Sequence, residues 1–529
     1  MKILFLMTDL QQTKYYDATM RFLLQRGHRI HLAFFNPWEP EKEKMHDKLV
    51  AAFPETFSFG KAPRKRSDLW HALCLGCAWG MDYLLYFHSS MEHAHRLRKR
   101  VETRIHPAFV WLLRECPLTN TRPGRRVIKK VLRGVYDFIP LNSSIKKFIK
   151  SLEPDVLLVT PLVFQGSLQS EYLRAARALG IPTGHCVASW DNLTTKGVIR
   201  GDPDKVMLWN ELQKQEAITL HETPPEKIIV TGAQYFDDWF VRTPSRTREE
   251  FCTVIGLPQE KPILLYMCSS NFMAPNEPRF VLRWIAAIRG CGIPGIAAAG
   301  ILIRPYPKAV QQWQTVDLTQ YENVVVWPRD GESASTDTGK INFYDSVYHS
   351  LAVIGINTTA MIESAIIGRC VLTVLAPELH ESQSNTIHFN YMRQEYGGFL
   401  YLARDLEEHM KQLQEICGQS DQMKEQVARF VQSFVRPHGI EHPCVPILAA
   451  SIEELAHTVP QAMRFSLLRT AGRCLLYPLA MFMMIIRLAT FGTRREKKTE
   501  RKKLFQQARN MGRDPLEYVG HVKKSQVKL

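Results

Sequence analysis

The stretch that decides the fold is DSVYHSLAVIGINTTAMIESAIIGRCVLT, residues 345–373. It contains an apolar run at 351–355, a polar loop with Asn357, a helical segment and a second apolar run that begins at Cys370. Short apolar runs of this kind are typical of strands that are covered on both faces. Gly368 supplies a residue at which the helix can end before the next strand. The stretch therefore predicts a strand, a tight loop, a helix and a parallel strand, which is one unit of an α/β fold.

The same alternation extends in both directions along the chain. Helical segments near 18–25 and 168–179 separate further apolar runs, and the pattern restarts after a polar stretch at 242–248. This predicts two Rossmann-like domains in tandem, facing one cleft. In such sheets ligands bind beyond the carboxyl ends of the strands, so the loops there are where chemistry is expected. The predicted strands lie at 2–7, 30–35, 155–160, 183–188, 205–209, 228–232, 263–268, 300–304, 323–327, 351–355 and 370–375.

The start of the helix in the deciding stretch suits a phosphate. Asn357, Thr358 and Thr359 place two hydroxyls and free backbone amides at the positive end of the helix dipole, where an anion is stabilised. Glu363 follows four residues after Thr359, and its carboxylate can accept hydrogen bonds from the ribose diol of the same ligand. The alternative is an ordinary helix N-cap with a solvated glutamate, because Asn and Thr are common capping residues.

The segment from Gly355 to Gly368 resembles the donor-site signature of the glycosyltransferase B-fold (GT-B) superfamily, in particular bacterial surface-polysaccharide glycosyltransferases. Related families are the CDP-glycerol transferases and the UDP-N-acetylglucosamine 2-epimerases. The resemblance in architecture covers residues 1–440. It implies that Glu363 holds the ribose of a nucleotide and that the helix start holds its diphosphate. The glycine pair often found in the donor loop of these families is Asn357-Thr358 here.

Other predicted strand ends supply further candidates for donor binding. Arg304 precedes Pro-Tyr-Pro, which resembles the Arg/Lys-Pro-His-Pro of CDP-glycerol transferases, and its charge would offset that of a diphosphate. A surface ion pair is the alternative for this arginine. Ser269 and Ser270 end another strand, either as hydrogen-bond donors to phosphate or as turn residues. The loop after 370–375 adds polar candidates for sugar or phosphate contacts, although loops are polar by default. These candidates are His380, Glu381, Gln383 and His388.

The first domain carries candidates for acceptor binding, just past a predicted strand. Trp190, Asn192 and Lys196 combine aromatic, amide and ammonium groups that suit a sugar or phosphate ligand, and a structural turn is the alternative. A transfer with inversion needs a carboxylate near the acceptor to take the proton of its hydroxyl. Asp191 in this loop and Asp9 after the first strand are the two candidates for that catalytic base.

Basic residues are concentrated in two segments. The formal net charge of the chain is +16; residues 61–150 carry 19 basic and 6 acidic side chains, residues 461–529 carry 16 and 4, and the remainder has a net charge of −9. The acidic body offers no continuous basic channel, so nucleic acid is not expected as a partner. Both basic segments also contain apolar and aromatic residues, which favours an anionic membrane surface as the partner.

The apolar stretch at 464–491 is followed by a polybasic run at 494–503. Three arginines leave 13 consecutive uncharged residues, which Pro478 interrupts, whereas a membrane span needs about 20. We therefore expect residues 464–503 to lie on the membrane as an amphipathic and basic anchor without crossing it. A hairpin packed on the first domain and a spanning helix are the alternatives.

These patterns divide the 529 residues into three parts. Residues 1–240 form an acceptor domain with a helical insertion at 61–150, residues 241–460 form a nucleotide-donor domain, and residues 461–529 form a membrane-associating tail. The eleven cysteines are expected to be reduced thiols, since Cys74 and Cys77 lack a second pair that would complete a zinc site. The histidines lack acidic partners at ligand spacing, so no metal is expected.

The resemblance implies a glycosyltransferase. The lack of a metal signature predicts that it is metal-independent, and the apolar and basic segment 464–503 predicts that the enzyme is peripheral or monotopic on the cytoplasmic face of the cell membrane. It would move a sugar from a nucleotide-sugar, used as a co-substrate, to a lipid-linked or cell-surface glycan acceptor, as in polysaccharide biosynthesis of the cell envelope. A nucleotide-sugar 2-epimerase or a glycerophosphate-type transferase of the same fold is the alternative. An epimerase would act on a soluble substrate and would leave the two basic segments unexplained.

Overall fold

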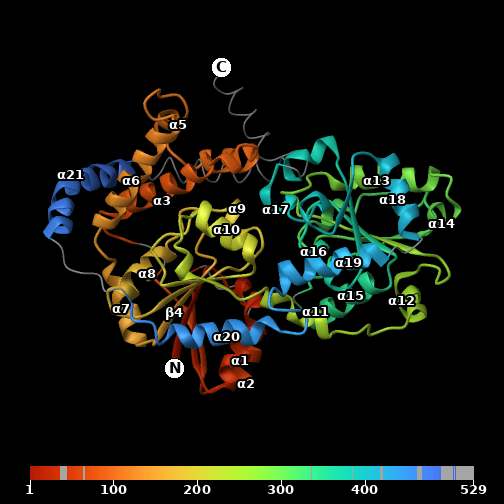
Figure 1. Ribbon diagram of the computed structural model, residues 1–529, viewed down its shortest axis with the longest axis horizontal. Coiled ribbons are helices and arrows are strands. Elements are labelled where there is room, and N and C mark those ends of the chain that lie inside the picture. Colours follow the sequence, from red (N-terminus) through yellow and green to blue (C-terminus); the bar gives the residue numbers. More distant parts are fainter. Residues whose placement is uncertain are drawn as a thin grey trace. The chain divides into compact units, whose positions relative to one another are not determined.

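The computed structural model describes residues 1–35, 44–63, 66–334, 336–383, 385–417, 421–460 and 467–489, together with residues 504 and 507. The chain forms two compact units, and each has its own parallel sheet (Figure 1). The first unit contains Met1–Asp237 and the helices α20 (Cys444–Leu455) and α21 (Leu467–Ala489), and the second contains Asp238–Ser433. The polybasic run at 494–503 lies outside the described residues.

The sheet of the first unit has seven parallel strands within the described residues, in the order β3-β2-β1-β4-β5-β6-β7. Its central strand β4 reads Val-Leu-Leu-Val-Thr and is buried along its whole length, as expected for a strand covered on both faces. The strand order reverses between β1 and β4, and open parallel sheets bind ligands at such a switch point. The strands are β1 (Lys2–Met7), β2 (Arg29–Phe34), β3 (Phe57–Lys61), β4 (Val156–Thr160), β5 (Thr183–Cys186), β6 (Lys205–Leu208) and β7 (Ile228–Val230).

Two groups of helices belong to the first unit. The first group accompanies the strands and comprises α1 (Asp17–Gln25), α2 (Lys44–Ala52), α8 (Gln169–Arg177), α9 (Asn192–Thr195) and α10 (Glu211–Thr219). The second group forms the predicted helical insertion, in which α3 packs against both α6 and α21 (Figure 1). It comprises α3 (His71–Leu85), α4 (His95–Glu102), α5 (Pro107–Arg114), α6 (Arg122–Phe138) and α7 (Ser143–Leu152).

Helix α20 belongs to the first unit, although it follows the second unit in the sequence. Its residues Leu448, Ile452 and Leu455 are buried in the same core as Leu23 of α1. The observed division therefore differs from the predicted boundaries at 240 and 460, because the chain returns to the first unit before α20. An apolar helix near the end of a domain carries no local signal for which of two cores it joins.

The sheet of the second unit has six parallel strands in the described part of the chain, in the order β10-β9-β8-β11-β12-β13. Its order reverses between β8 and β11, and Trp284 and Ile288 of α13 are fully buried in its core. The strands are β8 (Ile263–Met267), β9 (Gly300–Arg304), β10 (Val324–Val326), β11 (Ala352–Gly355), β12 (Cys370–Val374) and β13 (Leu400–Ala403). The helices are α11 (Asp237–Val241), α12 (Arg248–Ile255), α13 (Glu277–Gly290), α14 (Pro294–Ala297), α15 (Asp337–Tyr348), α16 (Ala360–Ile366), α17 (Ile387–Asn390), α18 (Leu406–Cys417) and α19 (Asp421–Phe430).

The predicted fold class, two Rossmann-like α/β units in tandem, is confirmed by these two parallel sheets. Every predicted strand is present, and small shifts occur at the strand ends. The strands β3 and β13 were not predicted. Each lies at an edge of its sheet, and their sequences Phe-Ser-Phe-Gly-Lys and Leu-Tyr-Leu-Ala are too short or too mixed to stand out as apolar runs.

Candidate functional site

The candidate donor site of the second unit begins at its switch point. Ser269 follows β8 and Asn357 follows β11, and both residues are buried. The backbone N–H of Asn357 donates a hydrogen bond of 3.4 Å to Oγ of Ser269, so the two strand ends are joined directly. The structure thus brings together two of the predicted donor-binding residues where a parallel sheet is expected to bind ligands. Ser270, the next residue, is half-buried.

The buried carboxyl group of Glu277 holds the backbone of Ser269 by hydrogen bonds. Both of its oxygens accept hydrogen bonds from the backbone N–H of Ser269, at 3.1 and 2.8 Å, and one accepts from the hydroxyl of Tyr266 at 3.2 Å. Burial raises the pKa of Glu277 to about 8, against the hydrogen bonds, which lower it. Sequence reasoning missed this residue; its position at the first residue of α13, eight residues after Ser269, was the available signal.

Glu277→Gln is expected to weaken the pH dependence of the free energy of unfolding between about pH 5 and 8. The stabilisation linked to this group is fully present below the unfolded pKa of 4.5 and is lost as the pH rises through the folded pKa of about 8, since the unfolded state binds fewer protons in that range. Urea denaturation at a series of pH values measures the slope. If wild type and variant share the same slope, the carboxyl group is already ionised in the folded protein.

Arg304 is the buried cation of the site. It ends β9, its side chain is only 4% exposed, and its guanidinium lies over the rings of Trp327 and Phe343 at 5.5 and 5.7 Å. Burial lowers its pKa to about 10, which Glu332 and Glu363 partly offset. The carboxylate of Glu332 forms a long ion pair with it, in which an oxygen lies 3.8 Å from Nη2 of Arg304. A cation that is desolvated and incompletely neutralised is suited to an anionic ligand.

The predicted helix start is α16, a short helix of seven residues. Its N-cap residue, Thr359, has helical backbone angles and makes no capping hydrogen bond through its side chain. Thr358, the residue before it, is half-buried. Glu363 is buried rather than solvated, and its charge acts on Arg304. The arrangement therefore departs from the alternative of a simple N-cap with a solvated glutamate.

The loop after β12 contributes a structural glutamine. Gln383 is fully buried, and its Nε2 donates to Oγ1 of Thr373 and to the carbonyl of Val374, both at 3.1 Å. Its side chain therefore ties the loop to β12. His388 is also buried, on α17. The side chains of His380 and Glu381 lie outside the described part of the structure.

In the first unit, the predicted acceptor residues occupy one tight loop around α9. The Asp191 carboxylate accepts hydrogen bonds from the hydroxyls of Ser189 at 2.8 Å and Thr195 at 2.9 Å, and Nζ of Lys196 lies 3.4 Å away. The amide of Asn192 donates a further bond of 3.2 Å to it. Trp190 is 4% exposed. The carboxylate is thus largely occupied by donors from its own loop, which is the arrangement of a structural turn.

Asp9 lies at the switch point of the first unit. It follows β1, the strand next to β4, and its Oδ1 accepts a hydrogen bond of 3.0 Å from the backbone N–H of Gln11. It thereby caps the short helix at Leu10–Tyr15. Its Oδ2 has no hydrogen-bond partner among the residues that the structure describes. Asp9 therefore keeps a carboxylate oxygen available for a ligand proton, which Asp191 does not.

The helical insertion holds the Asp191 loop by its backbone. The hydroxyl of Tyr86, the residue directly after α3, donates to the carbonyl of Lys196 at 2.6 Å, and Nη2 of Arg100 on α4 donates to the carbonyl of Thr195 at 2.6 Å. Asp82 of α3 is fully buried, accepts the backbone N–H of Val198 at 2.9 Å and pairs with Arg200. None of these three insertion residues was predicted, because nothing in the sequence links positions so far apart.

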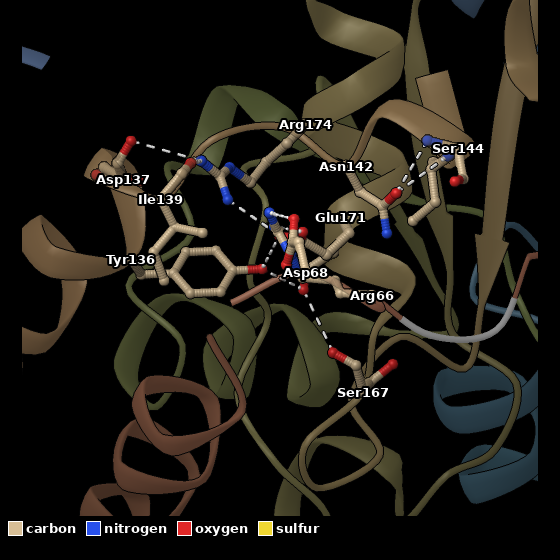
Figure 2. A network of polar contacts seen from close by, with 12 residues as sticks. Arg66, Asp68, Tyr136, Asp137, Ile139, Asn142, Ser144, Ser167, Glu171 and Arg174 are labelled. Carbon is tan, nitrogen blue, oxygen red and sulfur yellow. Dashed lines mark hydrogen bonds and ion pairs between the residues drawn. The ribbon is translucent and has the colours of Figure 1, made fainter. Parts of the chain in front are cut away.

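The insertion is also fixed to α8 by a buried ionic network (Figure 2). Figure 2 shows Arg66, Arg174 and Tyr136 converging on Glu171. Arg66 pairs with one carboxylate oxygen of Glu171, while Nη1 of Arg174 at 2.9 Å and the hydroxyl of Tyr136 at 3.1 Å share the other. The side chains of Arg66 and Glu171 are at most 2% exposed. One carboxylate thus neutralises charge contributed by two separate segments.

The described residues contain no group of three or more side chains that could hold a metal ion. The sequence does contain one Asp-x-Asp triplet, Asp202-Pro203-Asp204, of the kind used by metal-dependent transferases. Both aspartates have protein partners: Asp202 pairs with Arg177 and Lys227, and Asp204 accepts two hydrogen bonds from Thr183. Independence from a metal stays a prediction.

No family model matches the chain, and no curated protein matches it. Solved structures similar to it include a glycosyltransferase from Rickettsia africae ESF-5 (11% identity, TM-score 0.48, 86% of this chain and 98% of that chain covered). A UDP-GlcNAc 2-epimerase from Neisseria meningitidis bound to UDP-GlcNAc has 12% identity and a TM-score of 0.47, with 86% and 100% covered. Acinetobacter baumannii MurG has 12% identity and a TM-score of 0.42, with 86% and 99% covered.

A glycosyltransferase and a UDP-GlcNAc 2-epimerase are thus among the neighbours, as they are among the families that the sequence resembles. With identities near 12% and TM-scores under 0.5, they assign no substrate, activity or site residue to this chain.

Proposed function

We propose that the protein is a glycosyltransferase that binds a nucleotide-sugar in its second unit and a lipid-linked or cell-surface glycan acceptor in its first. The observation that carries the proposal is the buried Arg304, on which the charge of the buried Glu363 acts, in the unit whose switch point joins Ser269 and Asn357. A cation and a carboxylate so arranged match the two ends of a nucleoside diphosphate. The guanidinium suits the diphosphate, and the carboxylate suits hydroxyls of the ribose.

In the proposed reaction, an acceptor hydroxyl oxygen forms a bond to the anomeric carbon of the sugar. The bond between that carbon and the diphosphate breaks, and the nucleoside diphosphate leaves with the electron pair. Arg304 stabilises the negative charge that develops on the leaving group, because a buried cation acts more strongly than one in water. The proton of the acceptor hydroxyl passes to a carboxylate of the first unit.

Asp9 is the better supported of the two candidates for the base. One of its oxygens is engaged by Gln11, and its position at the switch point of the first sheet suits a ligand. Asp191 is supported instead as a residue that shapes the acceptor loop, since its oxygens accept hydrogen bonds from Ser189 and Thr195. Trp190, Asn192 and Lys196 remain the proposed contacts of the acceptor on that loop.

The proposed acceptor places the enzyme on the cytoplasmic face of the cell membrane, in the synthesis of a cell-envelope polysaccharide. The same donor site would also suit a nucleotide-sugar 2-epimerase or a glycerophosphate-type transferase. Purified protein incubated with a radiolabelled nucleotide-sugar distinguishes them. Label in a lipid extract supports sugar transfer, an epimeric nucleotide-sugar without acceptor supports the isomerase, and transfer from a CDP-polyol alone supports the third.

Glu363→Ala is expected to weaken binding of the nucleotide-sugar by about 2 kcal/mol, the scale of lost hydrogen bonds to a charged group. Calorimetric titration with UDP, GDP, CDP, ADP and CMP first identifies the base, and the variant is then titrated with the best nucleotide. Glu249→Ala, at an exposed position in the first turn of α12, is the matched control and should bind like wild type. Wild-type affinity in a folded Glu363→Ala protein would remove the ribose role and the main support for the donor site.

A further inference from the structure

Helix α21 exposes a large apolar surface. Leu475 is 81% exposed and Phe482 is 60% exposed, and only 11% of the window Arg469–Ile486 is buried. Its inner side packs on the insertion, where Gly472 contacts Phe138 and Arg473 donates to the carbonyl of Phe138 at 3.1 Å. In the part of the chain that the structure describes, α21 is the one helix whose length and composition would allow a membrane crossing. The further exposed apolar residues are Leu467, Tyr477, Leu479, Ile485 and Ile486.

Helices α5 and α6 of the insertion add exposed residues of both kinds. Trp111 is 58% exposed on α5, and Leu118 is exposed in the loop that follows it. On α6, Val127 and Val131 are exposed among three exposed basic residues, Arg122, Arg126 and Lys130. No ion pair involves these three cations among the described residues, whereas their neighbours Lys129 and Arg133 both pair with Glu222.

An anionic phospholipid bilayer is the occupant that this combination fits. A bilayer accepts exposed Trp, Leu, Phe and Ile side chains into its interface and at the same time attracts unpaired Lys and Arg through its negative surface charge. A protein partner would have to match both an apolar face and separate cations, and a nucleic acid would gain nothing from exposed leucine and isoleucine. The complementarity between these unpaired cations and a negatively charged lipid surface therefore favours the bilayer.

Helix α3 connects this surface to the proposed acceptor loop. Helix α3 contacts α21 and α6, and the ring of Trp70, directly before α3, lies 6.4 Å from that of Tyr477 on α21, measured between ring centroids. Asp82 of α3 holds the backbone of the loop at Val198, and Tyr86, which directly follows α3, holds it at Lys196. Helix α3 would thus connect a lipid-linked acceptor bound at this surface to the loop that is proposed to contact the acceptor.

We propose that the exposed faces of α5, α6 and α21 form one lipid-docking surface that binds an anionic phospholipid bilayer. The surface thus joins two helices of the insertion, α5 and α6, to α21, which lies within the stretch that the sequence predicts to be a membrane anchor. The role of this surface in presenting a lipid-linked acceptor to the first unit rests on the proposed function. The binding of the surface to a bilayer does not depend on that function.

The test is sedimentation of the full-length protein with vesicles of phosphatidylcholine alone or of equal parts phosphatidylcholine and phosphatidylglycerol. Wild type should bind the anionic vesicles and only weakly the neutral ones. Reversal of three charges on α6, Arg122→Glu with Arg126→Glu and Lys130→Glu, should lower the partition coefficient at least about a hundred-fold, since each basic residue near anionic lipid contributes about a factor of five. The matched control reverses the exposed lysines of α7, Lys146→Glu with Lys147→Glu and Lys150→Glu, and should retain most of the binding.

A second variant tests the apolar part without any change of charge. Phe482→Ser with Ile485→Ser replaces exposed residues, so the fold should persist, and binding to anionic vesicles should fall about ten-fold or more. Vesicle binding at the wild-type level in both the α6 and the α21 variants would overturn the proposal. A dimer that the wild-type protein forms in the absence of vesicles, and that these variants do not form, would also overturn it, because the surface would then bind a second copy of the chain. Nucleotide titration of the same samples tests the proposed function separately from vesicle binding. A variant that loses vesicle binding but still binds the nucleotide has an intact donor site.

Discussion

An Asp9→Asn enzyme is expected to lose about a hundred- to ten-thousand-fold in kcat while it binds the nucleotide-sugar as tightly as wild type. An amide cannot take the proton of the acceptor hydroxyl, whereas it can still accept the hydrogen bond from the backbone N–H of Gln11 that the carboxylate accepts now. The fold around β1 should therefore be retained. Initial rates of sugar transfer, together with calorimetry of the donor, measure the two effects separately.

Asp191→Asn is the matched comparison, since it makes the same change at the other predicted carboxylate. Its oxygens are engaged by the hydroxyls of Ser189 and Thr195 and by Lys196, so the substitution should disturb the loop and raise KM for the acceptor more than it lowers kcat. If Asp191→Asn alone abolishes turnover, the two roles are exchanged. Near-wild-type rates in both variants would exclude a carboxylate base and favour a retaining mechanism assisted by the donor phosphate.

The fold was predictable where the signal is local. The buried strands are short apolar runs, and the helix stop at Gly368, which has a positive φ of 80°, is a backbone requirement visible in the residue type. The predicted strand ends then indicated Arg304, at the end of β9, and Ser269 and Asn357, in the loops after β8 and β11. Each of these predictions needs only neighbouring residues and the general rule for parallel sheets.

The environment of the candidate site was not predictable in the same way. The burial of Arg304 depends on Trp327 and Phe343, and its partial neutralisation depends on Glu332, none of which is local to it. The occupied carboxylate of Asp191, by contrast, is a local turn and was available as the alternative reading. The return of α20 to the first core is a choice between two distant partners, which a single sequence does not encode in any short segment.

Glu171→Ala is expected to lower the free energy of unfolding of the first unit by about 3–5 kcal/mol, the largest stability effect of any single change considered. The substitution removes the carboxylate on which Arg66, Arg174 and Tyr136 converge (Figure 2). Arg66 keeps Asp68 as a partner, but Arg174 then has only backbone carbonyls within the network. A buried cation that loses its counter-ion costs far more than the loss of a surface pair.

The control is Glu211→Ala on α10, where the carboxylate is 66% exposed and pairs with Lys214 on the surface; a change of at most about 1 kcal/mol is expected there. Urea denaturation of both variants measures the difference, and nucleotide titration checks that the second unit is unaffected. A loss below about 1 kcal/mol for Glu171→Ala would mean that water replaces the carboxylate around the two guanidinium groups. The insertion would then be held to α8 by packing rather than by charge, and the network would have no part in positioning α3 and the acceptor loop that α3 supports.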